Sequence, residues 1–533
     1  MMGSVGEQLV RGLKARGVEV VFGIPGVHTV QLYRGLAGSG IRHVTARHEQ
    51  GAAFMADGYA RVSGKPGVAF LITGPGLLNA LAAMGQARAD SVPVLIISGV
   101  NRRASLGQGL GLLHEVPDQQ AMVRPLCPSF QVTAPEMLAS VLARAFAALE
   151  TGRPGPVHIE IPTDVMPLPC PAPGPARPRA APPRPDAEAV VEAAGMLRAA
   201  RAPVILAGGG ARRAGAAVQA LAERLGAPVV QTVNARGLMF GHPLGLGASA
   251  SLDAVRDVIR ASDRILAVGT ELGPTDYDMY ARGGLPDLSG MIRVDLCTEQ
   301  LARHPAALTI CADAGTTLAA LLEHLPAGGA TGDGAARVAR ALPAVHAEIA
   351  SLSAAMPAQL AMVEAIRTAM PGAILVGDST QPIYAANLCY DHDGPARYFN
   401  AATGFGALGF APGAAVGAAL ADPGRPVVCL IGDGGLQFSP GELRTAVDEH
   451  LHISFVVWNS AGFREIAEAM QAAQSQVIGC DPSPLKMEPF AAACDLPFQS
   501  VPQEPGALAA ALARPSRGPR MIEVRAFWSH ADR

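Results

Sequence analysis

The chain has 533 residues, of which 49% are apolar and 16% are charged, and its formal net charge is -3. This length predicts about three domains with large buried cores, and the composition excludes a disordered chain. Because basic and acidic residues nearly balance, we expect no nucleic-acid partner, and no apolar run in the sequence is long enough to span a membrane.

The eight cysteines are scattered along the chain, and none forms a C-x-x-C motif. They are therefore predicted to be reduced thiols, as in a cytoplasmic protein, rather than disulfides or a zinc site. The first residues lack the basic stretch and apolar core of a signal peptide, which agrees with a cytoplasmic location.

Residues 1–165 alternate short apolar runs with helical patterns, which is typical of a parallel, doubly wound α/β sheet. Strands are expected at 18–22, 41–44, 68–73, 94–98 and, as the last of the domain, 157–161. Polar or glycine-containing segments follow the strand ends, namely 23–28, 47–51 and 73–76. Such segments form the ligand-binding edge of an open parallel sheet.

Two side chains in this first domain are candidates for chemistry. Glu49 lies at a strand-to-helix junction among small residues, where an isolated glutamate is more often solvated or caps the helix. His114 lies in a glycine-rich loop, 101–120, that is too polar for a core element. An ordinary surface histidine is an equally good interpretation of His114.

Composition predicts two linkers that divide the chain into three domains. Prolines crowd the first linker, which should be stiff, and alanines dominate the second. The predicted order is domain 1–165, linker 166–186, domain 187–325, linker 326–354 and domain 355–533. The middle domain should begin with a helix at 187–200 and carry strands at 204–207, 229–230, 265–268 and 291–295. Gly208 to Gly210 follow its first strand, as in nucleotide-binding folds.

The third domain contains the most informative stretch, residues 427–463. One strand (427–431) leads into Gly432-Asp433-Gly434-Gly435, and a second strand (453–458) ends in Asn459-Ser460-Ala461-Gly462. A carboxylate with nearby carbonyl and hydroxyl oxygens at adjacent strand ends suits a hard divalent cation that holds a diphosphate. Gly-Asp-Gly alone is more often an ordinary turn.

Other elements of the third domain have clear signals. Ser439, Pro440 and Glu442 have the spacing of a capping box that starts a helix. Further elements are expected as a helix at 358–370, a strand at 374–377 followed by Asp378-Ser379-Thr380-Gln381, a glycine-rich run at 404–419 and a helix at 463–471.

The 427–463 arrangement resembles the signature of thiamine-diphosphate (ThDP) enzymes, in which Gly-Asp-Gly is followed by two asparagines at the end of the next strand. In that family the aspartate, the second asparagine and a carbonyl two residues later hold Mg²⁺, which implies Asp433, Ser460 and Gly462 here. Ser460 departs from the pattern. A hydroxyl is a shorter and poorer ligand than an amide, so we expect Mg²⁺ binding that is intact but weaker.

The first domain carries the other half of the resemblance. The segments H-E-Q-G-A-A-F-M-A-D-G-Y-A-R (48–61) and T-G-P-G (73–76) resemble the pyrimidine-binding domain of the branch that contains acetolactate synthases and 2-oxo-acid decarboxylases. The resemblance covers nearly the whole chain and implies three doubly wound parallel-sheet domains of the α/β class: pyrimidine-binding, central and diphosphate-binding.

The resemblance also implies roles for individual residues. Glu49 would hydrogen-bond N1′ of the aminopyrimidine, where a carboxylate exchanges a proton with the ring. Leu408 would support the V shape of the cofactor. The other implied cofactor contacts are Pro25, Gly26, Thr73, Asn79, Ser379, Gln381, Gly406, Gly432, Gly434, Gly435 and Phe463.

The substrate side departs from better-known relatives. Val27 stands where pyruvate decarboxylase has an aspartate, Ile466 where some decarboxylases have a glutamate, and His114 where carboligases have a glutamine. A pyruvate decarboxylase site is therefore not expected. Further candidates for substrate contact are His28, Glu115, Gln119 and Glu465. Glu465 could pair with a guanidinium group, although a helix glutamate of this kind is more often solvated.

The stretches FGIPGVHTVQLYRGL, LHEVPDQQ and VGDSTQPIYAAN look closer to 2-ketoarginine (5-guanidino-2-oxopentanoate) decarboxylases than to biosynthetic acetolactate synthases. This implies ThDP- and Mg²⁺-dependent decarboxylation of a 2-oxo acid, with the guanidino acid as a candidate substrate. Two alternatives stay open. One is carboligation of the acetolactate synthase type, and the other is a non-catalytic homologue whose cofactor binding is impaired at Ser460.

Two further expectations follow from the resemblance. The segment GTELGPTDYDMY lacks the Arg-Phe-Asp run of the FAD-binding members, so no functional FAD is expected. The family builds each active site between the pyrimidine side of one subunit and the diphosphate side of another. A homodimer or homotetramer is therefore implied.

Overall fold

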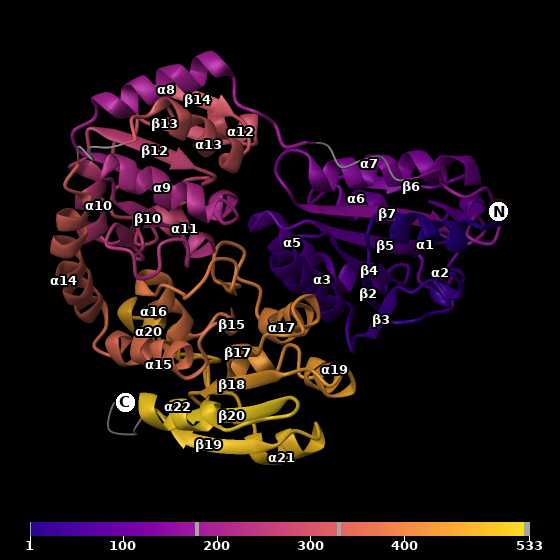
Figure 1. Ribbon diagram of the computed structural model, residues 1–533. Coiled ribbons are helices and arrows are strands. Elements are labelled where there is room, and N and C mark those ends of the chain that lie inside the picture. Colours follow the sequence, from indigo (N-terminus) through magenta and orange to yellow (C-terminus); the bar gives the residue numbers. More distant parts are fainter. Residues whose placement is uncertain (1, 176–180, 328–331, 527–533) are drawn as a thin grey trace.

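The computed structural model describes residues 2–175, 181–327 and 332–526, and it contains three separate six-stranded parallel sheets (Figure 1). Neighbouring residues along a strand point into different cores. In the first sheet Phe22 belongs to one apolar cluster and Val21 to another. Both faces of the sheet are therefore covered by helices, and the prediction of doubly wound α/β domains is confirmed.

The N-terminal sheet has the strand order β3-β2-β4-β5-β7-β6. Its strands are β2 (Val20–Gly23), β3 (Arg42–Thr45), β4 (Gly67–Leu71), β5 (Val94–Val100), β6 (Ser129–Gln131) and β7 (Pro156–Pro162). Its helices are α1 (Val5–Ala15), α2 (Val30–Leu36), α3 (Glu49–Ser63), α4 (Pro75–Asn79), α5 (Leu81–Ala89), α6 (Gln119–Val123) and α7 (Leu138–Glu150). At the start of the chain β1 (Gly3–Ser4) pairs antiparallel with β8 (Pro169–Cys170), which lies beyond the strand that we expected to be the last of the domain.

The central sheet has the order β11-β10-β9-β12-β13-β14. Its strands are β9 (Pro203–Ala207), β10 (Val229–Gln231), β11 (Gly245–Leu246), β12 (Arg264–Val268), β13 (Ile292–Asp295) and β14 (Leu308–Cys311). Its helices are α8 (Ala187–Ala199), α9 (Gly215–Leu225), α10 (Asp253–Arg260), α11 (Pro274–Tyr277), α12 (Thr298–Ala302) and α13 (Ala314–His324). The proline-rich stretch that precedes α8 is only partly described, because residues 176–180 lie outside the described ranges.

The C-terminal sheet has the order β16-β15-β17-β18-β20-β19. Its strands are β15 (Ile374–Gly377), β16 (Tyr398–Asn400), β17 (Val427–Gly432), β18 (Ile453–Asn459), β19 (Phe498–Pro502) and β20 (Arg520–Arg525). Its helices are α15 (Met356–Ala369), α16 (Gln381–Cys389), α17 (Phe410–Ala421), α18 (Asp433–Leu436), α19 (Glu442–Asp448), α20 (Arg464–Ala472), α21 (Met487–Ala493) and α22 (Pro505–Ala513).

Each sheet has a point where the direction of winding reverses. In the C-terminal sheet the chain runs from β15 outward to β16 and then returns to place β17 on the other side of β15. A crevice forms beyond the carboxyl ends of the two strands at such a point, and it is the usual ligand site of an open α/β sheet. The corresponding point of the N-terminal sheet lies between β2 and β4, and that of the central sheet between β9 and β12.

The N- and C-terminal domains share one apolar core through α3 and α17, which lie next to each other in Figure 1. Glycines allow the two backbones to approach. A Cβ atom on Gly58 of α3 would lie 2.0 Å from the carbonyl oxygen of Ala414, and one on Gly417 of α17 would lie 1.9 Å from that of Met55. A side chain at either position would therefore push the two helices apart.

Two predictions about elements need correction. The predicted second linker contains a helix, α14 (Gly334–Leu352), whose Val338, Val345 and Ile349 are buried, so this segment is a packed element. The predicted capping box does not form, because α19 begins after Gly441 without a side-chain cap. Glu442 accepts hydrogen bonds instead from the backbone N–H of Arg47 and His48, and thus joins the C-terminal domain to the N-terminal one.

In the described part of the chain, none of the helices combines the length and the apolar character needed to cross a membrane. All eight cysteines are free, as expected from their spacing.

Candidate functional site

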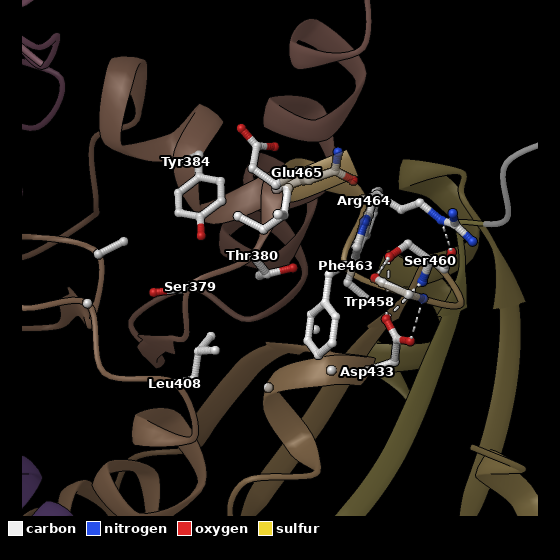
Figure 2. A pocket seen from close by; sticks show the side chains of 18 of the residues that line it. Ser379, Thr380, Tyr384, Leu408, Asp433, Trp458, Ser460, Phe463, Arg464 and Glu465 are labelled. Carbon is white, nitrogen blue, oxygen red and sulfur yellow. Dashed lines mark hydrogen bonds between the residues drawn. The ribbon is translucent and has the colours of Figure 1, made fainter. Parts of the chain in front are cut away.

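A cavity of about 550 Å³ lies beyond the carboxyl ends of β15, β17 and β18 (Figure 2). It occupies the crevice at the reversal point of the C-terminal sheet. The predicted cofactor contacts that line it are Ser379, Gln381, Gly406, Leu408, Gly432, Asp433, Gly434, Gly435, Ser460, Gly462 and Phe463. Residues widely separated in sequence therefore meet at one site.

The Asp433 carboxylate is the charged centre at one end of the cavity (Figure 2). It is only 4% exposed, and burial raises its pKa. The backbone N–H groups of Ser460 and Gly462 each donate a hydrogen bond of 3.1 Å to it, which favours the ionised form. The Ser460 hydroxyl lies 3.4 Å from Asp433 Oδ1 and donates to the Gly462 carbonyl at 3.1 Å.

A carboxylate, a hydroxyl and a carbonyl oxygen thus converge on one spot. Such oxygen ligands are the ones that Mg²⁺ and Ca²⁺ prefer. Among the residues described, no three His, Cys, Asp or Glu side chains gather to hold a metal. A cation at Asp433 would therefore depend on neutral oxygens and on a second anion, such as a diphosphate, for the rest of its ligands.

Close packing explains the glycines beside Asp433. A Cβ atom on Gly434 would lie 2.6 Å from the ring of Phe463, and one on Gly435 would lie 3.0 Å from Asp378 Oδ1. Larger residues at these positions would displace the Phe463 ring or the Asp378 carboxylate. The glycines therefore keep this end of the cavity open and its backbone accessible.

Asp378 is a supporting residue that we did not predict as part of the site. Its carboxylate accepts hydrogen bonds from the N–H groups of Ser379, Gly409 and Ala411, at 2.9, 3.3 and 2.9 Å. It therefore fixes both sides of the loop that presents Leu408 to the cavity. Burial raises the pKa of Asp378 to about 6, and the backbone donors offset part of that rise.

The other end of the cavity is formed by α16 and α20, with Tyr384 and Glu465 opposite Asp433 (Figure 2). Glu465 lies at this end and its side chain is exposed. Partial desolvation by the surrounding residues, and next the negative charge of Glu468, raise the pKa of Glu465. In the described ranges Glu465 forms no ion pair with a lysine or arginine. Ile466, the other predicted substrate contact on α20, is 52% exposed and lines the same cavity.

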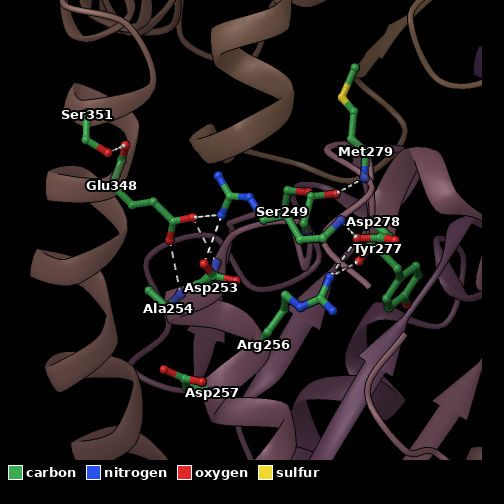
Figure 3. Close-up of polar contacts among 12 residues, drawn as sticks. Ser249, Asp253, Ala254, Arg256, Asp257, Tyr277, Asp278, Met279, Glu348 and Ser351 are labelled. Carbon is green, nitrogen blue, oxygen red and sulfur yellow. Dashed lines mark hydrogen bonds and ion pairs between the residues drawn. The ribbon is translucent and has the colours of Figure 1, made fainter. Parts of the chain in front are cut away.

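The central domain supplies part of the cavity wall, which the sequence did not lead us to expect. Residues 274–279 carry Pro274, Thr275, Asp278 and Met279 into the lining. Figure 3 shows how this segment is held. Arg256 donates to Asp278 at 2.9 Å, and Ser251 accepts from the N–H of Met279 at 2.9 Å. On α14, the Glu348 carboxylate accepts hydrogen bonds from the backbone N–H of Asp253, at the start of α10, and from Arg282. The helix α14, which we predicted to be a linker, therefore stabilises this wall.

The predicted residues of the N-terminal domain form a second face, and none of them lines this cavity. Glu49 is the first residue of α3, and its carboxylate accepts a 2.9 Å hydrogen bond from Asn79. Asn79, predicted to touch cofactor, thus orients Glu49. Pro25, Gly26 and Val27 follow β2 on a loop in which Val27 is 69% exposed.

The loop that carries His114 is anchored at both ends. Asn101 donates to the Leu113 carbonyl at 3.0 Å, and Gln119 accepts from the Gly74 N–H at 2.8 Å. Gln119 is 2% exposed and also donates to Ser98, Gly99 and Glu160, so it is a structural residue and not the substrate contact we predicted. The carboxylate of Glu115 accepts from the N–H groups of Leu110 and Leu112 in its own loop.

A second cavity, of about 670 Å³, lies between the N-terminal and central domains. Gly208 to Gly210, Gly269 and Arg212 line it at the reversal point of the central sheet. This is the position expected for a nucleotide in such a fold. The absence of FAD stays a prediction.

Comparison with known proteins agrees with this arrangement. Sequence models of the thiamine pyrophosphate enzymes match the chain in three parts: the N-terminal TPP binding domain at residues 3–122, the central domain at 190–321 and the C-terminal TPP binding domain at 376–524. The chain is 44% identical over 486 residues to the "Probable 2-ketoarginine decarboxylase AruI" of Pseudomonas aeruginosa, which covers 90% of this chain and 86% of the relative.

More distant relatives agree as well. The large subunit of acetolactate synthase isozyme 1 from Escherichia coli is 30% identical over 537 residues, or 97% of this chain and 93% of that protein. The X-ray structure of a Mycobacterium smegmatis protein assigned as a thiamin diphosphate-dependent enzyme superposes with a TM-score of 0.81 at 25% identity. It covers 99% of this chain and 100% of the other.

Proposed function

The chain belongs to the thiamine pyrophosphate enzyme family, and on that premise we propose that it decarboxylates a 2-oxo acid whose side chain ends in a cation. It is a ThDP-dependent enzyme of the decarboxylase and acetolactate synthase type. The proposed substrate is 5-guanidino-2-oxopentanoate. The overall reaction consumes one proton and converts R–CO–COO⁻ into R–CHO and CO₂.

The observation that carries the proposal is the 44% identity to a 2-ketoarginine decarboxylase over nine-tenths of the chain. The cavity supports it. Glu465 offers a carboxylate that forms no ion pair within the described residues, and it lies at the end opposite Asp433, as a guanidinium group requires. Met279 and Tyr384 provide apolar surface in the same cavity for an aliphatic chain.

The residues of the cavity fit ThDP and Mg²⁺. Asp433, Ser460 and the Gly462 carbonyl would hold the cation, while Leu408 and Phe463 would contact the rings. When bound, the thiazolium ring supplies an acceptor for the electron pair that remains when CO₂ leaves. Glu49, held by Asn79, would exchange a proton with the pyrimidine ring.

We also propose a homodimer, or a dimer of such dimers, in which the face around Glu49 closes the cavity of a second subunit. Glu49 and His114 do not line the cavity of their own chain, so a site that contains both halves needs a second contribution. No nucleic-acid or membrane partner is proposed, and the cytoplasmic location remains a prediction.

Carboligation is the second candidate function, because the chain is 30% identical to an acetolactate synthase subunit over 97% of its length. The third is a homologue with impaired cofactor binding, since Ser460 replaces the usual amide ligand. Titration calorimetry with ThDP and Mg²⁺ separates the third from the others. No heat at millimolar cofactor would favour the inactive interpretation.

The test of the proposal is CO₂ release by the purified protein with ThDP and Mg²⁺. Pyruvate, 2-oxobutyrate, a branched 2-oxo acid and 5-guanidino-2-oxopentanoate should be compared at equal concentrations. We expect release from the guanidino acid to exceed release from the others by at least about tenfold in kcat/KM. Preference for pyruvate would contradict the proposal.

A further inference from the structure

The loop at residues 459–462 carries two of the oxygens that would hold the cation, and one of them belongs to a short side chain. Ser460 stands where an amide ligand was expected, and its hydroxyl lies 3.4 Å from Asp433 Oδ1. Mg²⁺ requires its ligands at about 2.0–2.1 Å in a nearly ideal octahedron. A serine has few torsion angles with which to follow a loop that shifts. The position of the loop therefore decides whether Ser460 can act as a ligand.

The conformation of this loop is unfavourable by itself. Ala461 has a φ of 56°, in the left-handed region that L-residues other than glycine rarely adopt. Gly462 has a φ of 148°, and a Cβ atom there would lie 2.5 Å from the carbonyl oxygen of Cys480. Such backbone persists only where surrounding contacts determine it. The contacts around the loop are therefore part of the cation site.

The Arg464 side chain holds the loop from one side (Figure 2). Its Nε donates a 3.0 Å hydrogen bond to the Ser460 carbonyl, and its Nη2 donates one of 2.8 Å to the Ala461 carbonyl. Its Nη1 donates to Asp481 Oδ1 at 2.7 Å. Each of the three guanidinium nitrogens is thus bound to the protein, and two of them bind the loop itself. A lysine could not reproduce this fork.

The segment that contains Asp481 supports the same region. The backbone N–H of Phe463 donates to the Cys480 carbonyl at 2.9 Å, and Cys480 is buried. The Asp481 side chain is 60% exposed, whereas that of Arg464 is 13% exposed. An ion pair that is open to water on one side contributes little. The two carbonyl contacts of Arg464 are therefore the ones that fix the loop.

A buried pair of side chains holds the loop from the sheet. Asn459, the last residue of β18, donates through Nδ2 to Glu523 on β20 at 2.6 Å, and its Oδ1 accepts from the Ala461 N–H at 3.1 Å. The second oxygen of Glu523 accepts from the Ser500 hydroxyl on β19 at 2.7 Å. Both polar backbone groups of Ala461 are thus fixed, its N–H by Asn459 and its carbonyl by Arg464.

We propose that Arg464 is a positioning residue for the divalent cation, and that the Asn459–Glu523 pair supports it from the opposite side. Arg464 keeps the loop where the Ser460 hydroxyl and the Gly462 carbonyl can both bind the ion beside Asp433. It thereby compensates for the short reach of Ser460. The inference rests on the proposed function only in that this cavity takes ThDP with a divalent cation.

The charge of Arg464 makes the inference testable by the sign of an effect. A guanidinium ion near a cation repels it, so loss of the positive charge alone would strengthen cation binding. Loss of the two carbonyl contacts would weaken it, because the loop would no longer be held. Arg464→Met removes both the charge and the contacts, whereas Arg464→Lys keeps the charge and removes the fork.

The first experiment measures the binding of Mn²⁺, a spectroscopic substitute for Mg²⁺, to the purified full-length protein with saturating ThDP and no substrate. Electron paramagnetic resonance of free Mn²⁺ gives Kd. We expect Arg464→Met, Arg464→Lys and Asn459→Ala each to raise Kd about tenfold or more. Asp481→Asn is the matched control and should change Kd by less than about threefold. Tighter binding in Arg464→Met with an unchanged Arg464→Lys would overturn the inference.

The second experiment tests the compensation by restoring the longer ligand. In a Ser460→Asn background, the amide can follow a displaced loop, so Arg464→Lys should raise the Kd for Mn²⁺ by no more than about threefold. The four proteins form a double-mutant cycle. An equal loss from Arg464→Lys in both backgrounds would show that Arg464 does not compensate for Ser460.

The outcomes separate this inference from the proposed reaction, since no substrate is present. Mn²⁺ binding that weakens as expected, in a protein that releases no CO₂ from any 2-oxo acid, would contradict the proposed function and leave the role of Arg464 intact. A wild-type protein that binds no Mn²⁺ at millimolar concentration with ThDP would overturn the inference.

Discussion

Asp433 is a carboxylate that the fold keeps 4% exposed, and a charge so deeply buried needs partners. The N–H groups of Ser460 and Gly462 provide them, so the ends of β17 and β18 hold each other in place. The sequence indicated both segments, because each follows a strongly apolar strand. It could not indicate the exact path of the second loop, which depends on positive φ at Ala461 and Gly462.

Glu465 allows a test of substrate specificity at a single residue. At about pH 8, Glu465→Gln should raise KM for 5-guanidino-2-oxopentanoate roughly tenfold, because a charge-assisted hydrogen bond is lost. KM for 2-oxohexanoate, which has no cation, should stay within about twofold. Glu468→Gln is the matched control, one turn away on α20 and outside the cavity lining. Equal effects on both substrates would remove Glu465 from recognition of the cation.

Asp378 predicts a pH dependence of stability. Burial raises its pKa from about 3.8 to about 6, so the folded state binds the proton more tightly than the unfolded state does. The stability that this contributes is present at low pH and is lost as the pH rises through about 6. Compared with Asp378→Asn, the free energy of unfolding of the wild type should improve by about 2 kcal/mol between about pH 7.5 and pH 4.5. Urea denaturation at both pH values measures it, and a constant difference would refute it.

At the scale of elements, local patterns predicted the strands at the middle of each sheet but not β6, β11, β14, β16, β19 and β20, and they predicted the contacts between domains poorly. Ser439 to Glu442 have the spacing of a capping box, yet the Glu442 carboxylate binds backbone N–H groups of another domain, which no local pattern can reveal. We interpreted the segment of α14 as linker because it is rich in alanine. The helical spacing of Val338, Ala341 and Val345 was a usable signal.

The crossing of α3 and α17 predicts a large effect from one methyl group. Gly58→Ala would place a Cβ 2.0 Å from the Ala414 carbonyl, so it should destabilise the protein by about 1–3 kcal/mol. Gly195→Ala, in the middle of α8 with no atom within 4 Å of its Cβ position, should instead stabilise it by up to about 1 kcal/mol. Chemical denaturation of both variants gives the comparison. Similar results for the two would show that the helices can separate at low cost.

At the scale of the whole molecule, the residues to which we propose catalytic and cofactor-binding roles lie on two faces of one chain. Asp433 and Leu408 line the cavity of the C-terminal domain, whereas Glu49 and the adjacent rings of His28 and His114 lie on the N-terminal domain. The sequence indicated the two halves through their motifs. It could not indicate that His28 and His114 touch, because that contact depends on how two loops fold over Gly99.

A site shared between subunits predicts complementation. Glu49→Gln and Asp433→Asn should each abolish most activity without unfolding the protein. When the two variants are unfolded and refolded together in equal amounts, dimers that contain one of each should regain one complete site. Roughly a quarter of the wild-type activity should return. No recovery, with mixed dimers verified by mass spectrometry, would place both residues in the same subunit's site.

The most direct test of the central claim is identification of the organic product formed from 5-guanidino-2-oxopentanoate. The purified protein, supplied with ThDP, Mg²⁺ and equimolar pyruvate as competitor, should release the guanidino aldehyde that is one carbon shorter, in equal amount to CO₂. Acetolactate, or a condensation product of the two acids, would contradict the decarboxylase assignment and make the protein a carboligase.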